Sequence, residues 1–173
     1  MMKMSRMIVV VLFAMGFSSV AAAQGFAQGF DQRRLFFGAG LSSNSTDGAD
    51  NHPIGFQFFG GYNFGEFAPK FQLDAEVGYM DSGKFKKTVT VGPFSVSGES
   101  SATGLWATAV PRYMITPQIE LITRLGYDFG DDDGLMFGVG AGYIVNPKLK
   151  LRAEYVIRDN INSLQFNVVF YPW

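Results

Sequence analysis

LMFGVGAGYIVNPKLKLRAEYVIRDNINSLQFNVVFYPW, residues 135–173, contains three segments in which apolar residues alternate with other residues. In the middle segment one face holds Leu149, Leu151, Ala153, Tyr155 and Ile157, and the other holds Lys150, Arg152, Glu154, Val156 and Arg158. Successive side chains of a β-strand point to opposite faces, so this period of two predicts strands. A short Pro turn at 146–147 and a polar loop at 159–162 separate the three.

The same alternation recurs upstream of this stretch. It predicts five more strands, at 34–42, 54–64, 70–80, 102–114 and 119–129, which makes eight. Each is close to the ~9–11 residues of a strand that crosses a membrane. The segment 81–100 has a shorter alternation on both sides of Gly92-Pro93, which indicates a protruding hairpin. The predicted fold class is all-β, an eight-stranded antiparallel up-and-down barrel.

The N-terminus has the pattern of a secretory signal peptide. Lys3 and Arg6 precede an apolar stretch at 7–17, and small residues at 21–23 suit a cleavage site. The alternative is a membrane-anchoring helix, for which the apolar stretch is short. We therefore expect a signal peptide at 1–23, a polar lead-in at 24–33 and a barrel domain at 34–173.

Composition excludes several classes of protein. A chain of 173 residues with 47% hydrophobic residues fits one domain and is too apolar for disorder. The formal net charge of −1 gives no basic surface for nucleic acid, and the lack of Cys excludes disulfides and thiol chemistry. No cofactor is expected. The run 131–133, three Asp residues, is either a Ca²⁺ site or a solvated acidic turn.

Eight amphipathic strands can close around an apolar core in water, or turn their apolar face toward lipid. The second arrangement explains the glycines and charges of the other face, because glycines leave room in a narrow lumen and buried charges must pair. It also requires strand eight to pair with strand one, since lipid offers the backbone no hydrogen-bond partners. The expected lumen charge network is Asp74, Glu76, Arg112, Glu120, Arg124, Asp128, Lys150, Arg152, Glu154 and Arg158.

Aromatic residues are expected to form two girdles at the two membrane interfaces. With the N-terminus in the periplasm, the inner girdle comprises Tyr62, Phe64, Tyr113, Tyr143, Tyr171 and Trp173, and the outer one comprises Tyr79, Tyr127, Phe129 and Tyr155. Connections at 65–69, 116–118 and 146–148 are short, whereas 43–53 and 81–100 are long and polar. Short periplasmic turns and long outer loops are typical of membrane barrels.

From residue 34 onward the chain resembles the eight-stranded outer-membrane barrels typified by outer membrane proteins A and X of Gram-negative bacteria. The likeness is strongest at 138–143 (GVGAGY), at 151–155 (LRAEY) and in Val169, Tyr171 and Trp173, alternate residues of the last strand. It implies location in the cell outer membrane, a lipid environment that includes lipopolysaccharide, a monomer, and recognition of the last strand by the outer-membrane assembly machinery. Phe166, Val168 and Phe170 have the opposite parity, so a bulge is expected near Tyr171.

Three functions remain open from the sequence. The first is a structural or surface-interaction barrel, adhesion-like and not an enzyme, which acts through its outer loops and mainly 81–100, where Lys84, Lys86 and Lys87 could meet an anionic ligand. The second is a narrow channel for small solutes, supported by the lumen glycines. The third is a lipid-modifying barrel enzyme, for which His52, Asp50 and the serines 42, 43 and 45 are the candidate residues.

Overall fold

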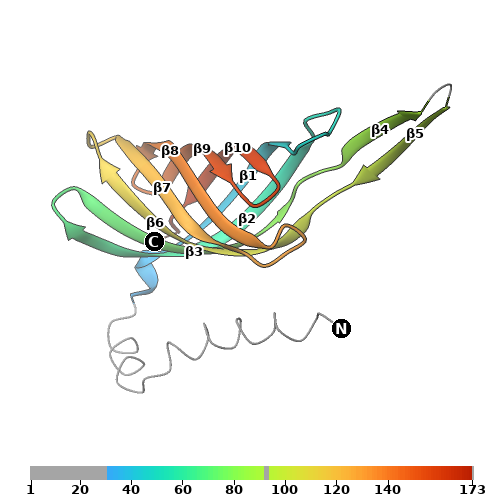
Figure 1. Ribbon diagram of the computed structural model, residues 1–173. Coiled ribbons are helices and arrows are strands. Elements are labelled where there is room, and N and C mark those ends of the chain that lie inside the picture. Colours follow the sequence, from blue (N-terminus) through green and yellow to red (C-terminus); the bar gives the residue numbers. More distant parts are fainter. Residues whose placement is uncertain (1–30, 92–93, 173) are drawn as a thin grey trace, which may run out of the picture. The chain divides into compact units, whose positions relative to one another are not determined.

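The computed structural model describes residues 31–91 and 94–172, within which eight antiparallel strands form a closed barrel (Figure 1). The order around the barrel is β1-β10-β9-β8-β7-β6-β3-β2. The barrel strands are β1 (Leu35–Ser45), β2 (Ile54–Ala68), β3 (Phe71–Asp81), β6 (Thr103–Met114), β7 (Ile119–Asp128), β8 (Gly134–Asn146), β9 (Leu149–Ile157) and β10 (Asn162–Phe170). The predicted architecture is confirmed. The predicted signal peptide lies outside the described residues, and a short 3-10 turn, Gln32–Arg34, precedes β1.

The barrel is closed by pairing of its first and last strands. β1 and β10 run antiparallel in continuous register from Phe37↔Phe170 to Ser45↔Asn162. This closure gives the barrel strands no free edge, which is the condition for placing a sheet in hydrocarbon. Within residues 31–91 and 94–172, no helix has the length and hydropathy of a membrane span.

The wall of the barrel is apolar outside and largely polar inside. In β9, Leu151 is 44% exposed on the outer wall, whereas Arg152 next to it is only 2% exposed in the interior. The alternation continues along the strand, with Tyr155 and Ile157 outside and Glu154 and Arg158 inside. Water would penalise such an outer surface, and lipid favours it, so the burial pattern is that of a membrane barrel.

For the last strand, the prediction of which alternate residues face outward is wrong. Phe166, Val168 and Phe170 face outward, whereas Val169 is fully buried in the interior. Tyr171 follows it inward, with its ring centroid 5.1 Å from that of Phe36. Pairing with β9 continues from Asn162 to Phe170 without the expected bulge.

The physical reason for this parity lies in the polar residues of the strand. Gln165 and Asn167 need hydrogen-bond partners that lipid cannot supply, and both are buried in the lumen. Their parity places the neighbouring Phe166 and Val168 outside and Val169 inside. Tyr171 therefore does not belong to the inner girdle, and Trp173 lies outside the described residues.

The turn predicted at 65–69 is shorter than expected. β2 continues to Ala68, and its pairing with β3 shifts between Asn63 and Gly65 and again between Glu66 and Ala68. Gly65 has a φ of 88° and Lys70 a φ of 67°, values that lie in the left-handed region. Two bulges and a left-handed turn residue thus extend this hairpin beyond the predicted strand end.

Two adjacent valines of β10 test the corrected parity, because Val168 is 48% exposed and Val169 is 0% exposed. The chain has no Cys, so Val168→Cys and Val169→Cys each carry a single thiol. We expect the protein labelled with a fluorophore at 168 to fold in vesicles and to be quenched by spin-labelled acyl chains. The same label at 169 should block folding, measured as loss of the gel shift between boiled and unboiled samples. Quenching at 169 with none at 168 would restore the original parity.

Candidate functional site

The structure places all ten side chains of the lumen charge network in the barrel interior, where each is buried. Five are acids and five are bases: Asp74, Glu76, Glu120, Asp128 and Glu154 beside Arg112, Arg124, Lys150, Arg152 and Arg158. They come from β3, β6, β7 and β9 and from the residue after β9. Balanced charge is what a low-dielectric interior requires, since an unpaired buried ion costs several kcal/mol.

Arginines in the central part of the network each join two carboxylates. Arg112 lies 2.8 Å from Asp74 and 2.6 Å from Glu120, measured from nitrogen to oxygen. Arg124 lies 2.9 Å from Glu76. The same guanidinium lies 3.0 Å from a carboxylate on β9. The forked guanidinium suits this bridging role, because its several N–H donors lie in one plane.

Arg152 connects the two halves of this network. Its guanidinium donates to Glu76 and, over 3.3 Å, to Asp74. Lys150 reaches Glu120 over 3.4 Å. Strands β3, β6, β7 and β9 are therefore linked across the lumen as well as through their backbones.

A separate ion pair lies near the end from which the β3–β6 connection extends. Arg158 donates to Asp128 over 3.0 Å and to Ser163 over 2.9 Å. Ser163 in turn donates to Asn44 over 2.6 Å. The pair thus links β7 to the β9–β10 region and to β1.

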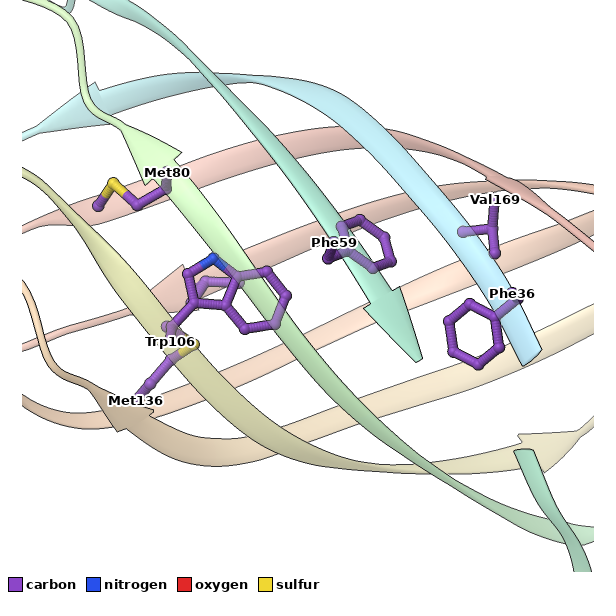
Figure 2. Packing of buried hydrophobic residues seen from close by; sticks show 7 residues of the cluster. Phe36, Phe59, Met80, Trp106, Met136 and Val169 are labelled. Atoms are coloured by element: carbon purple, nitrogen blue, oxygen red, sulfur yellow. The ribbon is translucent and has the colours of Figure 1, made fainter. Parts of the chain in front are cut away.

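Apolar side chains fill a further part of the lumen. Figure 2 shows the buried cluster, which consists of Phe36, Phe59, Met80, Trp106, Met136, Val156 and Val169. Arginines pack directly against it: the Arg124 guanidinium lies 5.0 Å from the centroid of Trp106, and that of Arg152 lies 5.7 Å from Phe36. Such cation–π contacts favour a desolvated cation over an aromatic face. Ion network and apolar cluster therefore form one interlocked filling.

Sequence reasoning missed the aromatic part of this filling. The signal that would have found it is a cross-strand pairing of large with small residues. Trp106 pairs with Gly78 and Phe36 pairs with Gly61. A Cβ atom on Gly78 would lie 2.5 Å from Trp106, which no real Cβ atom tolerates. The lumen glycines are thus occupied by neighbouring rings, as well as by charged chains such as Glu120 beside Gly142.

The predicted hairpin is present as β4 (Phe85–Val91) and β5 (Phe94–Ser100), which form their own two-stranded sheet. Figure 1 shows it continuing away from β3 and β6 beyond the barrel. Phe94 and Val96 are 74% and 72% exposed. The two residues are two positions apart in β5 and therefore share one face of the hairpin, where their side chains are available for contact with another surface.

Loop 46–53 anchors the base of this hairpin. The Asp50 carboxylate accepts a hydrogen bond of 2.8 Å from the Thr88 backbone N–H, and the Asp50 N–H donates to the Lys86 carbonyl over 2.8 Å. Asn51 accepts from the Lys86 N–H over 2.7 Å and donates to the Lys84 carbonyl over 3.0 Å. These four bonds hold the first strand of the hairpin against the loop.

Two of the candidate residues for lipid-modifying chemistry have hydrogen-bond partners outside the candidate set. The Asp50 carboxylate is used by the hairpin, and Ser42 points into the lumen, where Asn44 donates to it over 2.9 Å. His52 is exposed. In residues 31–91 and 94–172, His52 forms no hydrogen bond or ion pair with these groups.

The acidic run at 131–133 contributes to turns. Asp131 accepts from the Thr103 backbone N–H over 3.0 Å, and Asp132 accepts from the Asn160 N–H over 2.9 Å. No group of three or more metal-ligating His, Cys, Asp or Glu side chains occurs in the part of the chain that the structure describes. The carboxylates thus connect the β7–β8 loop to its two neighbouring loops.

Aromatic rings lie on the outer wall at both ends of the barrel. Tyr62 and Phe64 stack edge to face, with centroids 5.1 Å apart, near the short turns. Tyr127 and Phe129 lie 5.1 Å apart at the opposite end. The same wall carries the rings of Tyr79, Tyr113, Tyr143 and Tyr155. Their role at the membrane interfaces stays a prediction.

Arg158 and Asp128 provide a test of the lumen ion pairs, because both side chains are 2% exposed and they lie apart from the central network. Arg158→Met leaves the Asp128 carboxylate buried without its cation and should reduce the free energy of unfolding by ~3–5 kcal/mol. The double variant Arg158→Met/Asp128→Asn should recover part of this loss. Unfolding by urea in lipid vesicles, followed by tryptophan fluorescence, measures both effects.

Lys148→Met is the control, because Lys148 is exposed in a turn and its loss should change stability by less than about 0.5 kcal/mol. Equal stability of Arg158→Met and the control would show that the pair is solvated and contributes little.

Comparison with known proteins assigns the chain to a family. The model of the outer membrane protein beta-barrel domain matches residues 9–169. No curated protein sequence matches the chain. Among solved structures, Ail of Yersinia pestis in a phospholipid nanodisc is 16% identical, with a TM-score of 0.53 over 79% of this chain and 97% of Ail.

Two de novo designed transmembrane barrels share the fold as well. One is 21% identical, with a TM-score of 0.53 over 79% of this chain and 92% of the design. The other, TMB2.3, is 20% identical, with a TM-score of 0.50 over 80% and 94%. At these identities the likeness concerns the fold alone, whereas the family match covers most of the chain. The chain therefore belongs to the outer membrane protein beta-barrel domain family and resides in the outer membrane.

Proposed function

We propose that this protein is a non-conducting outer-membrane barrel that acts at the cell surface through the exposed face of its β4–β5 hairpin. The observation that carries the proposal is the combination of Phe94 and Val96, both more than 70% exposed, with the anchoring of the hairpin base by Asp50 and Asn51. Anchoring reduces the conformational entropy that a flexible loop loses when it binds a partner.

The lumen supports the non-conducting part of this proposal. An eight-stranded barrel has an interior just wide enough for side chains. Here that interior contains Trp106, Phe36 and Phe59 together with the arginines that pack on them. An ion that crossed it would have to displace paired charges as well as aromatic rings. A channel is the alternative, and it requires this filling to move.

An enzymatic role has less support. The candidate acid, Asp50, binds the hairpin backbone, and His52 is exposed. The structural neighbours described above, Ail and designed barrels, share the fold with this chain, and that likeness carries no information about catalysis. We therefore propose that the protein has no catalytic function and that the hairpin, with Lys84 and Lys86 at its base, contacts other surfaces.

Measurements of ion conductance test whether the lumen is closed. Wild-type protein in planar bilayers should show no reproducible current steps, because the interior is filled. Trp106→Ala removes the largest buried side chain and should produce small, brief openings, since its cavity lies beside Gly78, which has no side chain to fill it. Stable openings in the wild type would favour the channel function over the proposal.

Attachment tests the hairpin. Outer-membrane vesicles that carry the wild-type chain should attach to cultured epithelial cells more strongly than vesicles that carry Phe94→Ser/Val96→Ser. Ile115→Ser is the matched control, because it removes an exposed apolar side chain at the opposite end of the barrel. Attachment that is equal in all three preparations would contradict a surface role for this face of the hairpin. The gel shift on boiling checks that each variant is folded.

A further inference from the structure

A groove of about 690 Å³ lies on the outer wall, across β1, β2, β3 and β6. Its floor is low where small residues face outward, Gly60 on β2 and Ala107 on β6. Its rim is formed by the larger side chains of Phe58, Tyr79, Leu105 and Phe129. The volume falls within the ~300–1,000 Å³ range of small-molecule sites.

The shape of the groove follows from strand register. Gly60 pairs with Val77, and Val77 pairs with Ala107, so a row of outward residues without aromatic rings crosses three strands, with small residues on both sides of Val77. In the neighbouring row, Phe58 pairs with Tyr79, and Tyr79 pairs with Leu105. A row of large side chains thus borders a row of smaller ones. Phe58 and Tyr79 stack with centroids 5.5 Å apart, which makes this border continuous.

The position of the groove along the barrel shows which leaflet of the membrane surrounds it. The rim lies at the barrel end from which the hairpin extends, because Tyr79 is two residues before the end of β3 and Leu105 is two after the start of β6. The start of β1 and the end of β10 lie side by side at the opposite end of the barrel. In an outer-membrane barrel this places the groove in the outer leaflet.

The apolar lining of the groove favours an acyl chain as its occupant over a polar protein side chain or a lipid headgroup. The named rim and floor residues contain one polar side-chain atom, the Tyr79 hydroxyl, so a polar occupant would lose its hydrogen bonds there. Phospholipid and protein partners that enter from the membrane plane also bring apolar groups, and the charges beyond the groove favour an occupant that carries a phosphate.

Cationic groups lie just beyond the outer end of the groove. β3 and β6 form its floor and continue into the hairpin, whose base carries Lys84 and Lys86. Both ammonium groups are exposed and share a single carboxylate, Glu99, at 3.5 and 3.7 Å. From Tyr79 to Lys84 the chain spans at most ~17 Å at ~3.3 Å per residue, a distance that a lipid covers from its headgroup into its acyl chains.

We propose that this groove is a binding site for one acyl chain of a phosphorylated, multiply acylated glycolipid of the outer leaflet, with a phosphate of the same molecule at Lys84 and Lys86. The site differs from the general lipid contact of the wall in having a recessed floor and a fixed cationic group above it. The bound glycolipid would stay with the barrel when the surrounding lipid is exchanged for detergent.

Native mass spectrometry tests the site, with purified protein in detergent micelles and lipid A of defined acylation as the probe. Ala107→Phe and Gly60→Leu should fill the groove and abolish the retained lipid A. Gly60 accepts a side chain, since an added Cβ would lie 3.8 Å from its nearest neighbour, Phe37. Ala153→Phe is the matched control, because Ala153 is an exposed alanine on β9, which does not line the groove.

Wild type and Ala153→Phe should therefore each retain one lipid A molecule that both groove variants lose. Equal retention in all four proteins would overturn the proposal and leave general lipid contact. A protein dimer that is present in the wild type and lost in Ala107→Phe would assign the groove to a second copy of the chain.

Lys84→Gln/Lys86→Gln tests the headgroup. We expect this variant to retain less lipid A than the wild type, and its groove to remain intact. Unchanged retention in the lysine variant, together with loss in Ala107→Phe, would overturn the glycolipid assignment in favour of acyl chains of any lipid. The gel shift between boiled and unboiled samples identifies any variant that fails to fold and removes it from the comparison.

Discussion

Pairing of charge inside a closed ring of strands is the interaction on which this structure depends. Lipid leaves backbone groups no partner, so the sheet must close, and closure creates an interior that is too narrow for bulk water. Arg112, Arg124 and Arg152 make that interior possible, because Arg112 and Arg124 each join carboxylates from two strands and Arg152 links β9 to two carboxylates of β3. Asp74, Glu76 and Glu120 each pair with two bases, so the loss of one arginine would leave these acids with a remaining partner but the buried charge unbalanced.

Period-two alternation was enough to predict the strands, the closure and the inward face of seven of the eight barrel strands, because a large apolar residue and a charged residue have opposite preferences between lipid and lumen. It failed in β10, where both parities are apolar near the end and the decision rests on Gln165 and Asn167. It also missed Trp106 and Phe59, since an aromatic residue is compatible with either face. Only the register, which places Gly78 opposite Trp106, identifies these rings as filling.

The hairpin has a different physical basis from the barrel. Its two strands pair only with each other as a sheet, and its base is held by backbone bonds to Asp50 and Asn51. Such exposed bonds contribute about 1 kcal/mol each, so the hairpin can open locally while the barrel stays folded. The sequence predicted the hairpin from its alternation, whereas the anchoring by loop 46–53 depends on contacts between distant segments that local patterns do not encode.

Small residues have opposite consequences on the two faces of the same wall. Inside, Gly61 and Gly78 are covered by rings from the adjacent strand, so their lack of a side chain increases packing. Outside, a Cβ atom added to Gly60 would meet only ordinary contacts, the nearest at 3.8 Å from Phe37. A glycine that faces lipid contributes nothing to the packing of the barrel and weakens strand propensity. At this position the glycine gives the wall a recessed floor below a rim of aromatic rings, and such a floor gives an acyl chain more contact than a flat wall.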